Sequence, residues 1–137
     1  MEQQYILIIE NSLMNRHKIS EILNKDKINV KYANSAEEAL KILVKSNPYL
    51  LAMDMYLPRL NAHTLGSILK NDENTSDIKI VAFSNQLFNN PIVSPFDYMI
   101  QTNGKEYELA NGIKTFLKTV KPISTLIIKK GNHETNY

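Results

Sequence analysis

The chain has 137 residues, and its 16 basic and 14 acidic side chains leave a formal charge of +2 at pH 7. This length predicts one compact domain, residues 1–120, followed by a tail. Cysteine is absent, which excludes disulfides and cysteine zinc sites and favours a reducing, cytoplasmic location. No apolar run is long enough to cross a membrane, and the basic residues are scattered, so neither a membrane nor a nucleic acid is an expected partner.

Two apolar runs, residues 5–9 and 49–53, lack the polar alternation of a half-exposed strand. Such runs are typical of strands that helices cover on both faces of a parallel sheet, so both are expected at its centre. Residues 29–33 alternate, which indicates a strand nearer the edge. A helical period follows the first strand over residues 13–24, with apolar side chains at Leu13, Ile19, Ile22 and Leu23.

A second helix is predicted to begin at a capping box. In such a box the Ser35 side chain accepts a hydrogen bond from the backbone of the first turn, and the Glu38 side chain reaches back to the backbone at the start of the helix. Its expected apolar face is Ala39, Leu40, Leu43 and Val44. The helix ends before Asn47-Pro48, because the residue before a proline avoids helical geometry.

The second half of the chain continues the alternation of strands and helices. Leu65, Ile68 and Leu69 indicate a third helix, and residues 78–83 a fourth strand. The next segment contains Pro91 and Pro95, so the fourth helix is expected to be short or missing. The remaining predicted elements are a weak strand at 98–100, a helix at 106–119 that contains Gly112, and a candidate strand at 125–128 within the tail 121–137, with disorder beyond Lys130.

Alternating strands and helices at this spacing predict an α/β fold, a doubly wound five-stranded parallel sheet with helices on both faces. Ligands of such sheets bind at the carboxyl ends of the strands. Polar side chains gather just past those ends, and they are Glu10, Asn11, Asp54, Ser84 and Gln101. This edge is therefore the expected functional site.

Several segments together resemble the receiver domain of two-component response regulators, over about residues 5–118. They are the strand that ends in Glu10-Asn11, the helix start Met14-Asn15-Arg16, residues 33–40, the run from Met53-Asp54 to Pro58, Ala82-Phe83-Ser84 and Asp97 to Gln101. The resemblance implies the CheY-like, flavodoxin-like strand order 2-1-3-4-5. It also implies that Asp54 accepts a phosphoryl group from a histidine kinase or a phosphotransfer protein.

The resemblance assigns roles to the other residues at the sheet edge. Ser84 would donate its hydroxyl to a phosphoryl oxygen, Gln101 would lie beside the phosphate, and Tyr98 would act as the switch aromatic. The protein contacts of a magnesium ion would be Glu10, Asn11, Asp54 and the backbone carbonyl of Tyr56. A carboxylate suits this chemistry because it is ionised at pH 7, and magnesium neutralises phosphoryl charge.

Two residues of the expected site depart from the family pattern, since Asp usually stands at the position of Asn11 and Lys at that of Gln101. Losing a ligating carboxylate removes roughly 4 kcal/mol of attraction per pair of unit charges at about 4 Å and an effective dielectric near 20, so Mg²⁺ is expected to bind weakly. With Gln101 in place of the usual Lys, the site keeps an amide donor but loses the cation, and a hydrogen bond to a charged group is worth about 1.5–3 kcal/mol. The phosphorylated state is therefore expected to be less favoured. Because one charge of each sign is gone, Glu10 and Asp54 keep the site at two negative charges. Asn61-Ala62 also replaces the usual Asp-Gly.

Three functions are compatible with this pattern. The first is a stand-alone receiver, not an enzyme, that is phosphorylated on Asp54 and binds a separate downstream protein, with docking altered by the short fourth helix. The second is a pseudo-receiver that presents a protein-interaction surface without phosphorylation. The third is a flavodoxin-like domain that binds a small ligand. Structural roles compete with each assignment, because Asp54, Glu10 and Asn11 are also good caps and Tyr98 is an ordinary strand residue. His17, His63 and His133 show no ligand spacing and are expected in solvent.

Overall fold

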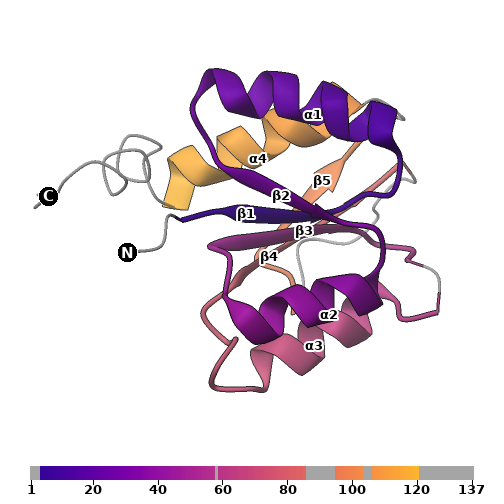
Figure 1. The fold of residues 1–137 in the computed structure, drawn as a ribbon, viewed down its shortest axis with the longest axis vertical. Helices are drawn as coiled ribbons and strands as arrows, with labels where there is room; N and C mark the ends of the chain where they lie inside the picture. Colours follow the sequence, from indigo (N-terminus) through magenta and orange to yellow (C-terminus); the bar gives the residue numbers. More distant parts are fainter. Residues whose placement is uncertain (1–3, 58, 86–94, 104–105, 121–137) are drawn as a thin grey trace, which may run out of the picture.

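The computed structural model describes residues 4–57, 59–85, 95–103 and 106–120. These residues form five strands and four helices, which alternate along most of the chain (Figure 1). The strands are β1 Ile6–Ile9, β2 Val30–Ala33, β3 Leu50–Asp54, β4 Lys79–Ser84 and β5 Tyr98–Gln101. The helices are α1 Leu13–Lys25, α2 Ala36–Lys45, α3 Ala62–Lys70 and α4 Glu106–Val120. Each lies where the sequence pattern predicted an element, to within a few residues.

All five strands run parallel in the order β2-β1-β3-β4-β5. Helices α1 and α4 cover one face of the sheet, and α2 and α3 cover the other (Figure 1). This confirms the predicted doubly wound fold. The chain crosses to the opposite side of β1 after β2, so the loops that follow β1 and β3 lie next to each other at the carboxyl edge.

Two apolar cores fill the space between the sheet and its helices. Alternate residues of each strand point into opposite cores. In β1, Ile6 and Ile8 enter the α1–α4 core, and Leu7 and Ile9 enter the α2–α3 core. All four are buried, which is why this strand reads as an uninterrupted apolar run.

Side-chain caps begin the first three helices and so fix where each loop at the carboxyl edge ends. Ser12, Ser35 and Asn61 accept the backbone N–H three residues on, at 3.2, 3.1 and 2.9 Å. In α2 the carboxylate of Glu38 accepts the backbone N–H of Asn34, the residue before the N-cap Ser35, so the predicted capping box is present with its return bond displaced by one residue. Asn61 of the unusual Asn-Ala pair is itself the cap of α3.

Three apolar residues of the predicted helical patterns are exposed. Leu13 of α1 is 78% exposed, Val44 of α2 is 86% exposed, and Ile68 of α3 is 49% exposed. Helical periodicity locates the buried stripe of a helix but not its width, and these residues lie beside the stripe rather than in it. His17 and His63 are exposed, as expected, and His133 lies outside the described residues.

The connection from β4 to β5 shows no helix in its described residues, 85 and 95–97. Residues 86–94, on which the expectation of a short or missing fourth helix rests, lie outside the described part of the chain. Helix α3 packs closely on the end of this connection, since a Cβ on Gly66 would lie 2.8 Å from Cγ of Pro95. The rings of His63 and Phe96 also meet edge to face, with centroids 6.3 Å apart.

Helix α4 packs against β5 through its own glycine. A Cβ on Gly112 would lie 2.7–2.9 Å from three side-chain atoms of Ile100. The glycine therefore permits a close approach of helix and strand, which accounts for a residue that weakens the helix itself. The tail, with its candidate strand at 125–128, lies outside the described residues. Within the described ranges, no helix has the length and apolar character needed to span a membrane.

Candidate functional site

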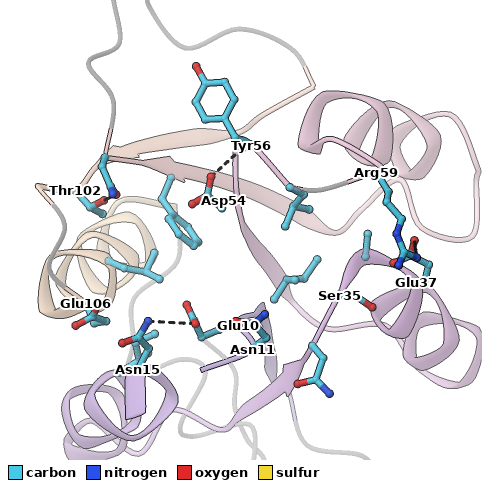
Figure 2. Close-up of a pocket in the computed structure, with 18 residues that line it drawn as sticks. Glu10, Asn11, Asn15, Ser35, Glu37, Asp54, Tyr56, Arg59, Thr102 and Glu106 are labelled. Atoms are coloured by element: carbon cyan, nitrogen blue, oxygen red, sulfur yellow. Dashed lines mark hydrogen bonds and ion pairs between the residues drawn. The ribbon is translucent and has the colours of Figure 1, made fainter. Parts of the chain in front are cut away.

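A cleft of about 690 Å³ opens at the carboxyl edge of the sheet (Figure 2). Its walls come from the loops after all five strands and from the N-terminal parts of α1, α2 and α4. Polar side chains from elements far apart in the sequence share it, and they include Glu10, Asn11, Asn15, Asn34, Ser35, Glu37, Asp54, Tyr56, Arg59, Asn85, Thr102 and Glu106.

Four of the predicted site residues lie together in this cleft: Glu10, Asn11, Asp54 and Tyr56. Strand alternation accounts for the two carboxylates. Glu10 continues the row of Ile6 and Ile8 in β1, and Asp54 ends the corresponding row of β3, so both side chains leave the sheet on the α1–α4 side. Figure 2 shows the two carboxylates on different walls of one opening.

Glu10 is held by the first turn of α1. Its Oε2 accepts the backbone N–H of Ser12 at 3.0 Å and the amide of Asn15 at 3.2 Å. The backbone carbonyl of Glu10 accepts a hydrogen bond from Nε of Arg16 at 2.6 Å. Within the described residues nothing donates to Oε1, so one oxygen fixes the carboxylate and the other is available to a ligand.

Asp54 is arranged in the same way. Oδ1 accepts the backbone N–H of Tyr56 at 2.8 Å, whereas Oδ2 receives no hydrogen bond from the described part of the chain. Tyr56 is 59% exposed, and its ring points away from the Asp54 carboxylate in Figure 2. Asp54 therefore presents a fixed carboxylate with one unengaged oxygen in an open cleft.

The oxygen atoms around Asp54 suit a hard divalent cation. Carboxylates of Glu10 and Asp54, the amide oxygen of Asn11 and the carbonyl of Tyr56 are the donor types that Mg²⁺ takes, usually together with several waters. No group of three or more acidic or histidine side chains that could hold a metal occurs among the described residues. The donor set thus fits a hard divalent cation such as Mg²⁺, which two carboxylates would hold.

Ser84 and Gln101 are not among the residues that line the cleft. Ser84 is 1% exposed, and Nε2 of Gln101 donates to the carbonyls of Ser84 and Thr102, at 3.2 and 3.4 Å. The next residue in each segment lines the cleft instead, namely Asn85 after β4 and Thr102 after β5. The hydroxyl of Thr102 donates to Oδ1 of Asn85 at 3.2 Å. The sequence pattern placed Ser84 and Gln101 at the site and did not identify Asn85 and Thr102.

Tyr98, the expected switch aromatic, stacks on Phe116 of α4. The ring centroids are 4.9 Å apart and the planes differ by 20°. Tyr98 is partly buried against the α1–α4 core, so its ring lies on the helix side of β5. A rotation of this ring would have to break the stacking contact with α4.

Charged residues border the cleft on the α2 and α4 sides. Arg59 pairs with Glu37 at 3.5 Å, and Lys18 pairs with Glu106 at 3.7 Å. The pKa of Glu37 is below its ordinary value, mainly because its own backbone N–H donates to the carboxylate, with Arg59 adding to the effect. Arg59 has a φ of 67°, which is uncommon for a residue with a side chain. Sequence patterns alone do not pair Glu37 with Arg59, because Glu37 lies in the first turn of α2 and Arg59 lies in the loop between β3 and α3.

Comparisons with known proteins agree with this geometry. A family profile described as "Response regulator receiver domain" matches residues 6–94. A signal receiver domain of a signal transduction histidine kinase from Syntrophus aciditrophicus is 20% identical, with 98% of each chain covered and a TM-score of 0.68. The chemotaxis response regulator CheY4 of Vibrio cholerae is 15% identical, with 89% of this chain and 99% of that chain covered and a TM-score of 0.67.

A third solved structure, the Mn²⁺-bound form of response regulator Rcp1, is 16% identical, with 86% of this chain and 97% of that chain covered and a TM-score of 0.70. At these identities the structural likeness shows the fold. Curated protein sequences include no significant match to this chain. The profile match spans most of the sheet and the loops that carry Glu10, Asn11 and Asp54. The chain therefore belongs to the response regulator receiver domain family of two-component signalling.

Proposed function

We propose that this receiver domain accepts a phosphoryl group on Asp54 from a histidine kinase or a phosphotransfer protein, with a weakly bound Mg²⁺ present, and signals through a separate protein partner. The observation that carries the proposal is Oδ2 of Asp54, which accepts no hydrogen bond from the described residues and lies in a cleft that Glu10 also lines. A site with room for a phosphate needs an open volume, and the cleft measures about 690 Å³.

The chemistry requires an ionised oxygen that can attack phosphorus. Oδ2 of Asp54 forms the new P–O bond while the P–N bond of a phosphohistidine donor breaks, and the histidine nitrogen leaves with the electron pair. Magnesium, when bound, neutralises charge on the transferred group. The Tyr56 N–H holds Oδ1 at 2.8 Å, which orients the attacking oxygen, and Ser12 and Asn15 keep the Glu10 carboxylate in place.

A phosphorylation-independent interaction module is the second candidate, and one observation favours it. The amide of Gln101 donates to two backbone carbonyls and does not line the cleft, and the cation that usually stands at this position is absent. In that case the fold would present a binding surface only, and Asp54 would stay unmodified.

Incubation with Mg²⁺ and acetyl phosphate, followed by intact-mass measurement, separates the two candidates. The wild type should gain the mass of one phosphoryl group, and Asp54→Asn should gain none. Asp72→Asn is a matched control, because Oδ1 of Asp72 also accepts the backbone N–H two residues on at 2.8 Å but is not among the residues that line the cleft. This control should be modified like the wild type. A wild type that is never modified favours the interaction module.

A further inference from the structure

The structure brings two polar residues, Asn85 and Thr102, into the cleft that Asp54 also lines. The resemblance to receiver domains assigned no role to either residue. Both follow the predicted phosphate contacts, Ser84 and Gln101, by one residue. The difference of one residue decides which side of the sheet each side chain faces.

Strand pairing explains why the later residue of each segment enters the cleft. Ser84 pairs with Gln101 in the β4–β5 ladder, and the Thr102 N–H extends the ladder to the Ser84 carbonyl at 2.8 Å. Phe83 and Ile100 point into the α1–α4 core, so two residues further on Asn85 and Thr102 leave on that same side. This is also the side from which Glu10 and Asp54 enter.

The hydrogen bond between the two residues orients the Asn85 amide. Thr102 is 4% exposed, and its hydroxyl donates to Oδ1 of Asn85 at 3.2 Å. With Oδ1 engaged as the acceptor, Nδ2 is left with two N–H donors, and no described residue accepts from it. Asn85 is exposed and lines the cleft, so an amide whose oxygen is engaged by a buried hydroxyl keeps two donors for a ligand there.

We infer that Nδ2 of Asn85 donates to the phosphoryl oxygens carried on Asp54, and that the buried Thr102 hydroxyl positions this amide. The inference rests on the proposed function and names the donor that serves where the usual cation is absent. Asn85 is the residue that contacts the phosphoryl group, and Thr102 acts through it. A neutral amide stabilises the phosphorylated state less than a cation does, because hydrogen bonds to charged groups are strongest when both partners are charged.

In the first measurement, the full-length protein is titrated with beryllofluoride in the presence of Mg²⁺, and binding is followed by amide NMR. In the second, the protein is phosphorylated with acetyl phosphate, and the lifetime of the phosphorylated form is measured. Asn85→Ala should bind beryllofluoride about 10- to 100-fold more weakly, the range for one lost hydrogen bond to a charged group. Asn85→Asp, which replaces both donors with a negative charge, should bind more weakly still. Asn111→Asp makes the same charge change on an exposed position of α4 and should bind like the wild type.

The Thr102 variants separate positioning from a merely structural role. Thr102→Val keeps the shape but removes the hydroxyl, and should weaken beryllofluoride binding and shorten the phosphorylated lifetime. Thr102→Ser restores the hydroxyl and should restore both. If Asn85→Ala binds and holds phosphate as the wild type does, the inference is overturned while the proposed function stands. If the wild type neither binds beryllofluoride nor is phosphorylated, both are overturned.

Discussion

Asp97 ties the start of β5 to β4, and its removal should loosen the site as well as the fold. Its backbone N–H donates to the Ile80 carbonyl at 2.8 Å, and its Oδ2 accepts the Ile80 N–H at 2.8 Å. The same oxygen pairs with Lys70 of α3 at 2.9 Å. This contact precedes the register that pairs Ser84 with Gln101, so it helps to place Thr102 beside Asn85.

The cost of Asp97→Ala follows from the groups that lose a partner. Ile80 is fully buried, and a buried N–H without an acceptor costs about 1–3 kcal/mol. The ion pair to Lys70 adds less than about 1 kcal/mol, because both side chains are partly exposed, at 26% and 30%. We expect a total loss of about 2–3 kcal/mol in the free energy of unfolding, since the two terms act on one side chain.

Urea unfolding measures this loss, and hydrogen exchange of the Ile80 amide localises it. Asp97→Asn keeps an oxygen that can accept the Ile80 N–H, so it should cost about 1 kcal/mol or less. Lys70→Met removes the cation, together with its hydrogen bond to the Ile78 carbonyl at 3.0 Å, and should also cost about 1 kcal/mol. An Asp97→Ala variant that loses no more stability than Asp97→Asn, or whose Ile80 amide exchanges at the wild-type rate, would contradict this role of Asp97.

Three further predictions concern packing, metal binding and pH. Gly112→Ala should lower the free energy of unfolding by about 1 kcal/mol, because overpacking against Ile100 outweighs the gain of about 1 kcal/mol in helix propensity; urea unfolding checks this, and a stabilised variant would contradict the close contact. Asn11→Asp adds a carboxylate at the cleft and should tighten Mg²⁺ binding by more than about tenfold, as measured by calorimetry. An unchanged affinity would show that residue 11 does not contact the ion. Burial raises the pKa of Tyr32 and Tyr49 above the ordinary 10.0. Their contribution to stability is therefore complete below pH 10.0 and is lost as the pH rises through the higher pKa of the folded state. Unfolding at several alkaline pH values tests this, and a free energy of unfolding that does not fall there would contradict it.

Much of the fold is predictable from the chain alone because each element carries its own local signal. Strands such as β1 and β3 are buried on both faces, so they read as continuous apolar runs. The helix starts carry their caps at Ser35 and Asn61. Exposure of Leu13 and Val44 was not predictable in the same way, since the width of a buried stripe depends on what packs beside the helix.

The site was predictable as an edge of the sheet but not residue by residue. Glu10 and Asp54 end apolar strands, and the topology brings such ends together. Asn85 and Thr102 were missed because their orientation depends on the register between β4 and β5, which local sequence does not specify. Counting in steps of two from Phe83 and Ile100, once these are known to be core residues, would have found both.

Asp54 is the residue that we propose to carry the phosphoryl group, and its modification can be located directly. After reaction with acetyl phosphate and Mg²⁺, borohydride reduces an acyl phosphate on an aspartate to the alcohol, and peptide mass spectrometry then locates it. We expect this reduction product at position 54, only when the phosphoryl donor and Mg²⁺ are both present. A product at a different aspartate, or an intact Asp54 in protein that has gained phosphate, would contradict it.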